Sequence, residues 1–177
     1  RLMAIVTESH LNVIAYFDSI CGRGEDHAVG MGCDIGEMLS PGMYREFVVP
    51  YYTQIWQRYP GWRSLHMCGN INHLLGVLRD ELAIDELNGF GFPADPNQLA
   101  TEWAGRVVMI GGPNPLLVAN GPIAAIEEAA KRYIDTLASR GGYILSLGGG
   151  AAVGTPPEYL NAMVESAKRW VPHVDPE

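Results

Sequence analysis

The chain has 177 residues, 47% of them hydrophobic, and its 12 basic and 20 acidic side chains give a formal net charge of −8. A chain of this length and composition can bury the core of one domain. The negative balance, without any basic run, argues against nucleic acid and anionic membranes as partners. No run of 18 apolar residues occurs, so the sequence predicts no membrane span.

The three cysteines, Cys21, Cys33 and Cys68, are widely spaced and form no CxxC pair. This usage does not fit a disulfide framework and favours a reducing, cytoplasmic setting. The chain opens on Arg1 inside a helical pattern, from which we expect that something upstream has been removed.

The first elements alternate between helix and strand. Apolar spacing predicts a helix over 2–20, which Gly22 and Gly24 end. A short strand interrupted by glycines is expected within 27–36. Ser40 is a suitable N-cap for a helix that reaches residue 59, and Pro50 predicts a kink or break inside it.

The remaining elements continue the alternation. Two capping boxes are expected, one formed by Asp95 with Gln98 and the other by Thr155 with Glu158. The predicted elements are strands at 62–69, 85–92, 106–112 and 142–150, and helices at 72–82, 94–104, 122–139 and 155–170.

This order of apolar strands and amphipathic helices predicts an α/β fold with parallel strands, either a barrel or a doubly wound sheet. No GxGxxG follows the first strand, which weakens a dinucleotide-binding interpretation. Five units are too few to close a (β/α)8 barrel, and an open sheet would leave two apolar edges. We therefore expect part of a barrel, or edges covered by another chain or a second copy.

Function in such folds lies at the carboxyl ends of the strands. His66 and Cys68 are two residues apart on a strand and face the same side, as a shared Zn²⁺ would require. A zinc site needs a further ligand, so a small buried cysteine beside a hydrogen-bonded histidine remains an alternative. The candidate residues at the predicted strand ends are Cys33 and Asp34, then His66, Cys68, Gly69 and Asn70, then Asp95, then Gly111-Gly112-Pro113-Asn114, and then Gly148-Gly149-Gly150.

Four segments together resemble a known family. They are DIGEMLSPGMYREFVVPYY at 34–52, HMCGNINHLL at 66–75, GGPNPLL at 111–117 and GYILSLGGGAAVGTPPEYLNAMVESAK at 142–168. Their order is similar to the C-terminal part of the uroporphyrinogen decarboxylase superfamily, which includes zinc-dependent, corrinoid-linked methyltransferases. The resemblance implies the C-terminal five βα units of a (β/α)8 barrel, with 1–24 as the helix of the preceding unit and 25–177 as the five units.

The sequence HMCG resembles the methyltransferase branch, which implies zinc on His66 and Cys68 and activation of a thiol acceptor. That branch has a third ligand, a cysteine, where this chain has Gly149 and the decarboxylase has histidine. The candidate replacements are Asp34, Cys33, Asp95 and His73, of which we expect Asp34 to act as a ligand or in proton transfer. Its alternative role is to cap the following turn.

The expected function is methyl transfer to a thiol, with a corrinoid protein as partner and a small-molecule substrate. Asn70, Gly112 and Asn114 are expected to line the substrate pocket. The glycine-rich ends could instead serve close packing and tight turns, or hold an anion on their backbone amides. Two other functions stay open, a metal-free tetrapyrrole decarboxylase and a non-catalytic half-barrel that serves assembly.

Overall fold

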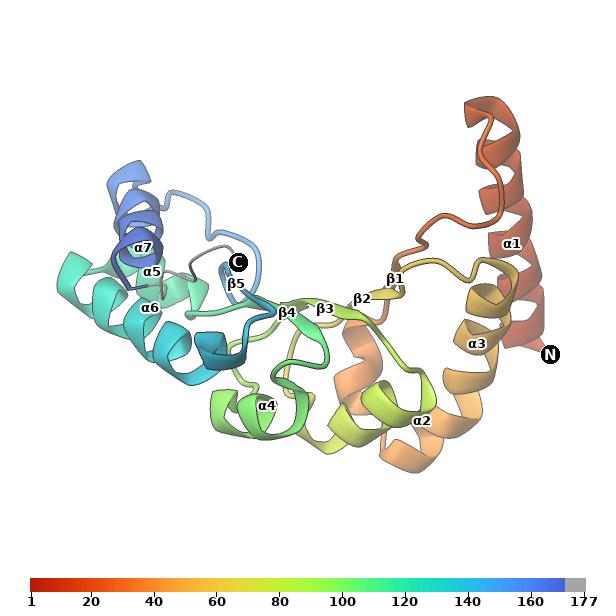
Figure 1. Ribbon diagram of the computed structural model, residues 1–177, viewed down its shortest axis with the longest axis horizontal. Helices are drawn as coiled ribbons and strands as arrows, with labels where there is room; N and C mark the ends of the chain where they lie inside the picture. Colours follow the sequence, from red (N-terminus) through yellow and green to blue (C-terminus); the bar gives the residue numbers. More distant parts are fainter. Residues whose placement is uncertain (171–177) are drawn as a thin grey trace.

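The computed structural model describes residues 1–170. The strands in this part of the chain form one five-stranded parallel sheet. The strands pair in chain order, β1 to β5, so each helical connection crosses back over the same face. The strands form a curved row with the helices along its convex side, and the concave side is open (Figure 1). This is the arrangement of successive βα units in a (β/α)8 barrel, which confirms the predicted fold class. The strands are β1 (Met31–Gly32), β2 (Ser64–His66), β3 (Glu86–Phe90), β4 (Val108–Gly111) and β5 (Tyr143–Leu145).

The helices follow the predicted alternation, with one break and one addition. The break after Phe47 separates α2 from α3 at Val48, and Pro50 lies in the first turn of α3. Proline supplies no N–H for the helical ladder, which explains the interruption and confirms the prediction. The short α5 was not predicted. The helices are α1 (Leu2–Cys21), α2 (Pro41–Phe47), α3 (Val49–Arg58), α4 (Pro96–Trp103), α5 (Pro115–Asn120), α6 (Ile123–Leu137) and α7 (Pro157–Trp170).

The helix predicted over 72–82 is irregular. A 3₁₀ turn at Asn72–Leu74 leads into a π-helical segment at Val77–Glu81, with Gly76 between them. Glycine is the weakest helix former after proline, and a side chain that must reach the core there can pull the ladder out of α-helical register. The prediction of a regular helix was wrong in this detail.

The two predicted capping boxes have different outcomes. Asp95 caps α4, because its carboxylate accepts a hydrogen bond from the N–H of Asn97 at 2.9 Å. Gln98 does not complete the box, since its amide donates to the carbonyl of Asn72. The box at Thr155 is wrong, because this hydroxyl donates to the carbonyl of Ala152.

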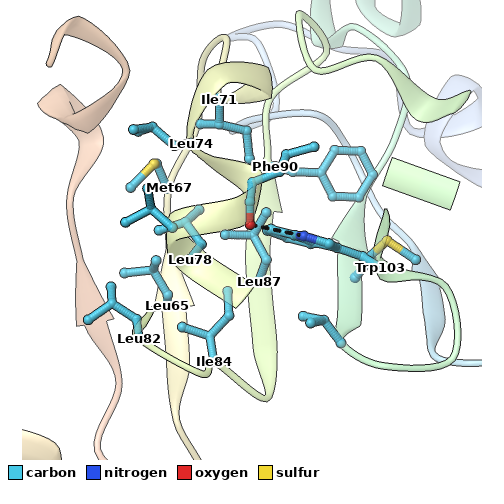
Figure 2. Packing of buried hydrophobic residues seen from close by; sticks show 14 of the residues in the cluster. Leu65, Met67, Ile71, Leu74, Leu78, Leu82, Ile84, Leu87, Phe90 and Trp103 are labelled. Atoms are coloured by element: carbon cyan, nitrogen blue, oxygen red, sulfur yellow. Dashed lines mark hydrogen bonds between the residues drawn. The ribbon is translucent and has the colours of Figure 1, made fainter. Parts of the chain in front are cut away.

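The core lies between the sheet and the helices on its convex side (Figure 2). Leu65 and Met67 of the β2 segment are fully buried there, whereas His66 between them is exposed on the open side. Trp103 of α4 is also fully buried, and its indole N–H donates to the carbonyl of Leu75 at 3.3 Å (Figure 2). The alternation along β2 therefore divides core residues from residues that can carry chemistry.

The two ends of the sheet and helix α1 leave apolar surface uncovered. Within the described part of the chain, strands β1 and β5 each have one neighbour, so each has an unpaired edge. Helix α1 packs on α3 but exposes large side chains such as Leu2, Tyr16 and Phe17. Within residues 1–170, no helix combines the length and apolar character needed to cross a membrane.

Candidate metal centre

The carboxyl ends of β1 and β2 meet and bring three polar side chains together. The backbone N–H of Cys33 donates to the carbonyl of His66 at 2.9 Å, which ties the end of β1 to the end of β2. The chain then enters a 3₁₀ turn at Asp34–Met38, so Asp34 starts directly beside His66. Position in the fold, rather than proximity in sequence, therefore joins Asp34 to the pair His66 and Cys68.

Asp34, His66 and Cys68 form a group that could hold a metal ion, with their ligand atoms all within 4.8 Å of one another. The Asp34 Oδ1 atom lies 3.2 Å from His66 Nε2 and 3.6 Å from Cys68 Sγ. The side chains of His66 and Asp34 are 48% and 65% exposed, on the open side of the sheet. Among the described residues, this is the group of metal-binding side chains that meets these distances.

These spacings can be compared with a tetrahedral zinc site. Bond lengths of about 2.1 Å to nitrogen and oxygen and about 2.3 Å to sulfur place neighbouring ligands about 3.4 Å (N–O) and about 3.6 Å (S–O) apart. The observed separations of 3.2 and 3.6 Å are close to both values. Two of the three separations therefore match a tetrahedral zinc site, and the third, between His66 and Cys68, lies within 4.8 Å. Such a set would supply three protein ligands and leave one position open, the pattern of catalytic rather than structural sites.

The imidazole of His66 lies against a glycine of the neighbouring strand. Gly89 interrupts the pairing of β3 with β4 as a bulge and has φ +73°. A Cβ atom at Gly89 would lie 2.7 Å from Cε1 and 2.9 Å from Nδ1 of His66. The ring thus packs on bare backbone, which orients Nε2 toward Asp34.

The thiol of Cys68 is held in its protonated form when no cation is present. Burial raises the pKa of Cys68, and the Asp34 carboxylate, both as a charge and as a hydrogen-bond partner, raises it further. A neutral thiol is a poor nucleophile and a poor metal ligand. The environment of Cys68 is therefore unlike that of an independently activated cysteine.

The other candidates for a third ligand lie away from this group. Cys33 packs with Tyr44 and Tyr52, and burial raises the pKa of its thiol. Asp95 caps α4, and a ring nitrogen of His73 lies 2.9 Å from the carbonyl of Leu39. Of the four candidates, Asp34 is the one that joins His66 and Cys68.

The predicted substrate-pocket residues all lie at the carboxyl edge of the sheet, with local structural contacts. Asn70 donates its backbone N–H to Glu37, and its side chain accepts from the N–H of Asn72. Asn114 caps α5 through Leu116. A Cβ at Gly112 would lie 2.4 Å from the carbonyl oxygen of Ser146, and one at Gly149 would touch Pro115.

Sequence reasoning left open whether Glu37 faces the mouth of the barrel or solvent, and it missed Gly89. Glu37 contacts Asn70, and Gly89 contacts His66. A signal for Glu37 was present, because it follows Asp34 by three residues, and side chains three apart on a 3₁₀ turn share a side. No such signal marks Gly89, whose partner lies on another strand.

The parallel strands alternate with helices as in a barrel. The carboxyl ends of the first two strands carry an imidazole, a thiol and a carboxylate. Together these features define a barrel-type protein with a site that could hold a metal ion. The family model described as uroporphyrinogen decarboxylase (URO-D) matches residues 1–170. The chain belongs to the uroporphyrinogen decarboxylase family.

Named relatives agree with this assignment. Uroporphyrinogen decarboxylase of Xanthomonas campestris pv. campestris (strain B100) is 30% identical over 180 residues, which cover 95% of this chain and 49% of the relative. The protein of the same name from Xylella fastidiosa is 31% identical over 146 residues, covering 76% of this chain and 40% of the relative. The match with the Xanthomonas campestris protein thus takes in nearly the whole of this chain, but only about half the length of that relative.

A solved structure shares the fold. A methyltransferase from Methanosarcina mazei superposes with a TM-score of 0.66 over 81% of this chain and 42% of the methyltransferase, at 21% sequence identity. This likeness supports the barrel architecture.

Proposed function

We propose that this chain carries the metal centre of an enzyme that transfers a methyl group to a thiol, with His66, Cys68 and Asp34 as zinc ligands. The observation that carries the proposal is the convergence of imidazole, thiol and carboxylate within 4.8 Å on the open side of the sheet. A thiol and an imidazole are ligands that zinc prefers, and the three protein ligands leave a position for substrate.

Zinc, when bound, would lower the pKa of an acceptor thiol, so that a thiolate is available near neutral pH. The residues of the chain supply the arrangement. The exposed side chains of His66 and Asp34 face the open side, where a small thiol can approach. The sulfur lone pair forms the new S–CH₃ bond, the electron pair of the broken bond stays with the methyl donor, and the thiol proton goes to solvent. A corrinoid protein is the proposed donor.

A metal-free decarboxylase is the second candidate, because relatives that are about 30% identical carry that name. A substrate with several carboxylates calls for cations in the cleft. Three arginines of this chain are engaged elsewhere. Arg45 pairs with Glu81, Arg79 pairs with Asp80 and Glu102, and Arg63 donates to the carbonyl of Leu82. This use of the arginines favours methyl transfer.

The remaining units of the barrel are the proposed partner of the uncovered surfaces. The chain spans 49% of the Xanthomonas campestris relative and 42% of the methyltransferase structure. The remaining βα units of the barrel would pair with the free edges of β1 and β5, and they would pack on the exposed face of α1. A second copy of this chain, covering the same edges, is the other outcome of a sizing experiment. The proposed setting is the cytoplasm.

Metal analysis of the full-length protein tests the site. We expect about one equivalent of zinc per chain, and its loss in His66→Ala and Cys68→Ser. His10→Gln and Cys21→Ser are matched controls, because both residues lie on α1, outside the group of proposed ligands, and these variants should keep zinc. A protein without zinc, or variants with undiminished zinc, would overturn the metal centre.

A methyl-transfer assay separates the candidate functions. The zinc-loaded full-length protein should methylate a small thiol from a methylated corrinoid, and chelator treatment should abolish the reaction. Turnover of uroporphyrinogen by a metal-stripped preparation would instead support the decarboxylase. A folded protein without either activity would support the assembly module.

A further inference from the structure

Glu37 links the two segments that carry the proposed ligands. It lies in the 3₁₀ turn Asp34–Met38 that begins with Asp34. Its Oε2 atom accepts a hydrogen bond from the backbone N–H of Asn70 at 2.6 Å, within the loop that carries Cys68. One side chain therefore fastens the turn after β1 to the loop after β2.

The contact depends on a glycine beside it. A Cβ atom at Gly69 would lie 1.9 Å from Oε2 and 2.7 Å from Oε1 of Glu37, so a side chain there would displace this carboxylate from its present position. The backbone of Gly69 also lies close to Gly91, where a Cβ would be 2.4 Å from the Gly69 nitrogen. The loop after β2 is thus held between Glu37 and the end of β3.

Asp34 has no comparable support of its own among the described residues. Its side chain is 65% exposed, and its contacts are with His66 Nε2 and Cys68 Sγ. Because residues three apart on a 3₁₀ turn share a side, the anchor at Glu37 fixes the side on which Asp34 stands. A turn released from Asn70 would let Asp34 rotate toward solvent.

We propose that Glu37 is a positioning residue that holds Asp34 within ligand distance of His66 and Cys68, through the hydrogen bond to Asn70 over Gly69. The inference rests on the proposed metal centre. It assigns Glu37 no contact with the metal or the substrate. Residues that support metal ligands in this way typically contribute about 10–100-fold to metal affinity.

Zinc titration of the full-length protein against a chromophoric chelator tests this role. Glu37→Ala should weaken zinc binding by about 10–100-fold, whereas Glu37→Gln, whose amide oxygen can still accept from Asn70, should keep most of the affinity. Glu46→Ala, which removes an exposed glutamate of α2, is the control for net charge.

A double-mutant cycle shows whether Glu37 acts through Asp34. In an Asp34→Asn background, Glu37→Ala should cause little further loss of affinity. In the Co²⁺-substituted protein, the thiolate band should remain in Glu37→Ala. The rest of the spectrum should change in the same way as it does in Asp34→Asn. Additive losses, or equal losses in Glu37→Gln and Glu37→Ala, would overturn the positioning role. A wild-type protein that binds no zinc would instead overturn the metal centre itself.

Discussion

Gly89→Ala is the most direct test of how the fold orients His66. A Cβ at this position would stand 2.7 Å from Cε1 of the imidazole, whereas ordinary contact begins near 3.4 Å. The ring must therefore move by about 0.7 Å, or the bulge must open. Metal–ligand distances tolerate deviations of about 0.2 Å. The displacement exceeds this tolerance, so we expect zinc affinity to fall by about 10–100-fold, the range typical of lost supporting contacts.

The same substitution also has a cost in stability that is unrelated to the metal. Alanine at φ +73° costs about 1–2 kcal/mol for a left-handed backbone. Gly22 provides a control for the backbone cost, because it lies in the left-handed region with φ +63° and ψ +32°, and a Cβ added there would meet no atom within 4 Å. Urea denaturation should therefore show a loss for both Gly89→Ala and Gly22→Ala, while zinc titration should show a loss for Gly89→Ala alone. Wild-type zinc affinity in Gly89→Ala would refute the idea that this contact orients the ring.

Three further predictions concern stability, each measured by urea denaturation of the full-length protein. Trp103→Ala should cost about 3–5 kcal/mol, because the indole is fully buried and bonded to Leu75, and a loss under about 1 kcal/mol would contradict this packing. Asp95→Ala should cost about 1 kcal/mol through the lost cap of α4; no loss would mean that the cap is dispensable. Phe17→Asp should cost more than about 2 kcal/mol if the rest of the barrel covers α1, whereas an exposed site would lose under about 0.5 kcal/mol.

The sequence was sufficient to predict the order of the elements but not their lengths. A run of apolar residues in the sequence indicates which residues are buried. Buried residues extend beyond those that pair in the sheet. Val29 and Met67 are buried, yet β1 is Met31–Gly32 and β2 ends at His66. The predicted strands were therefore too long, although His66 and Cys68 lie on the same side, as predicted.

The place of the candidate site could be predicted from the sequence, but its geometry could not. Parallel strands end at one edge, so Asp34, His66 and Cys68 could be expected near one another. The sequence favoured Asp34 over Cys33, but their separation depends on the backbone of Cys33 (φ −146°, ψ 64°) and on the 3₁₀ turn that follows, neither of which was predicted. The direction of Glu37 depends on the same turn.

The hydrogen bonds at the glycine-rich ends of β4 and β5 bear on which ligands the carboxyl edge of the sheet can bind. The N–H of Gly148 donates to the carbonyl of Pro113 at 2.9 Å, and the N–H of Ser146 donates to the carbonyl of Gly111 at 3.0 Å. Because these two amides are already bonded to the backbone, neither is available to a carboxylate or phosphate.

At the other end of the same edge, Asp34 and Glu37 add negative charge beside the thiol of Cys68, and both raise its pKa. Two carboxylates around a protonated thiol and one imidazole form an environment that a cation stabilises and an anion does not. Bound zinc would convert Cys68 to thiolate and offset this negative charge, so the electrostatics of the site are compatible with the proposed zinc ion.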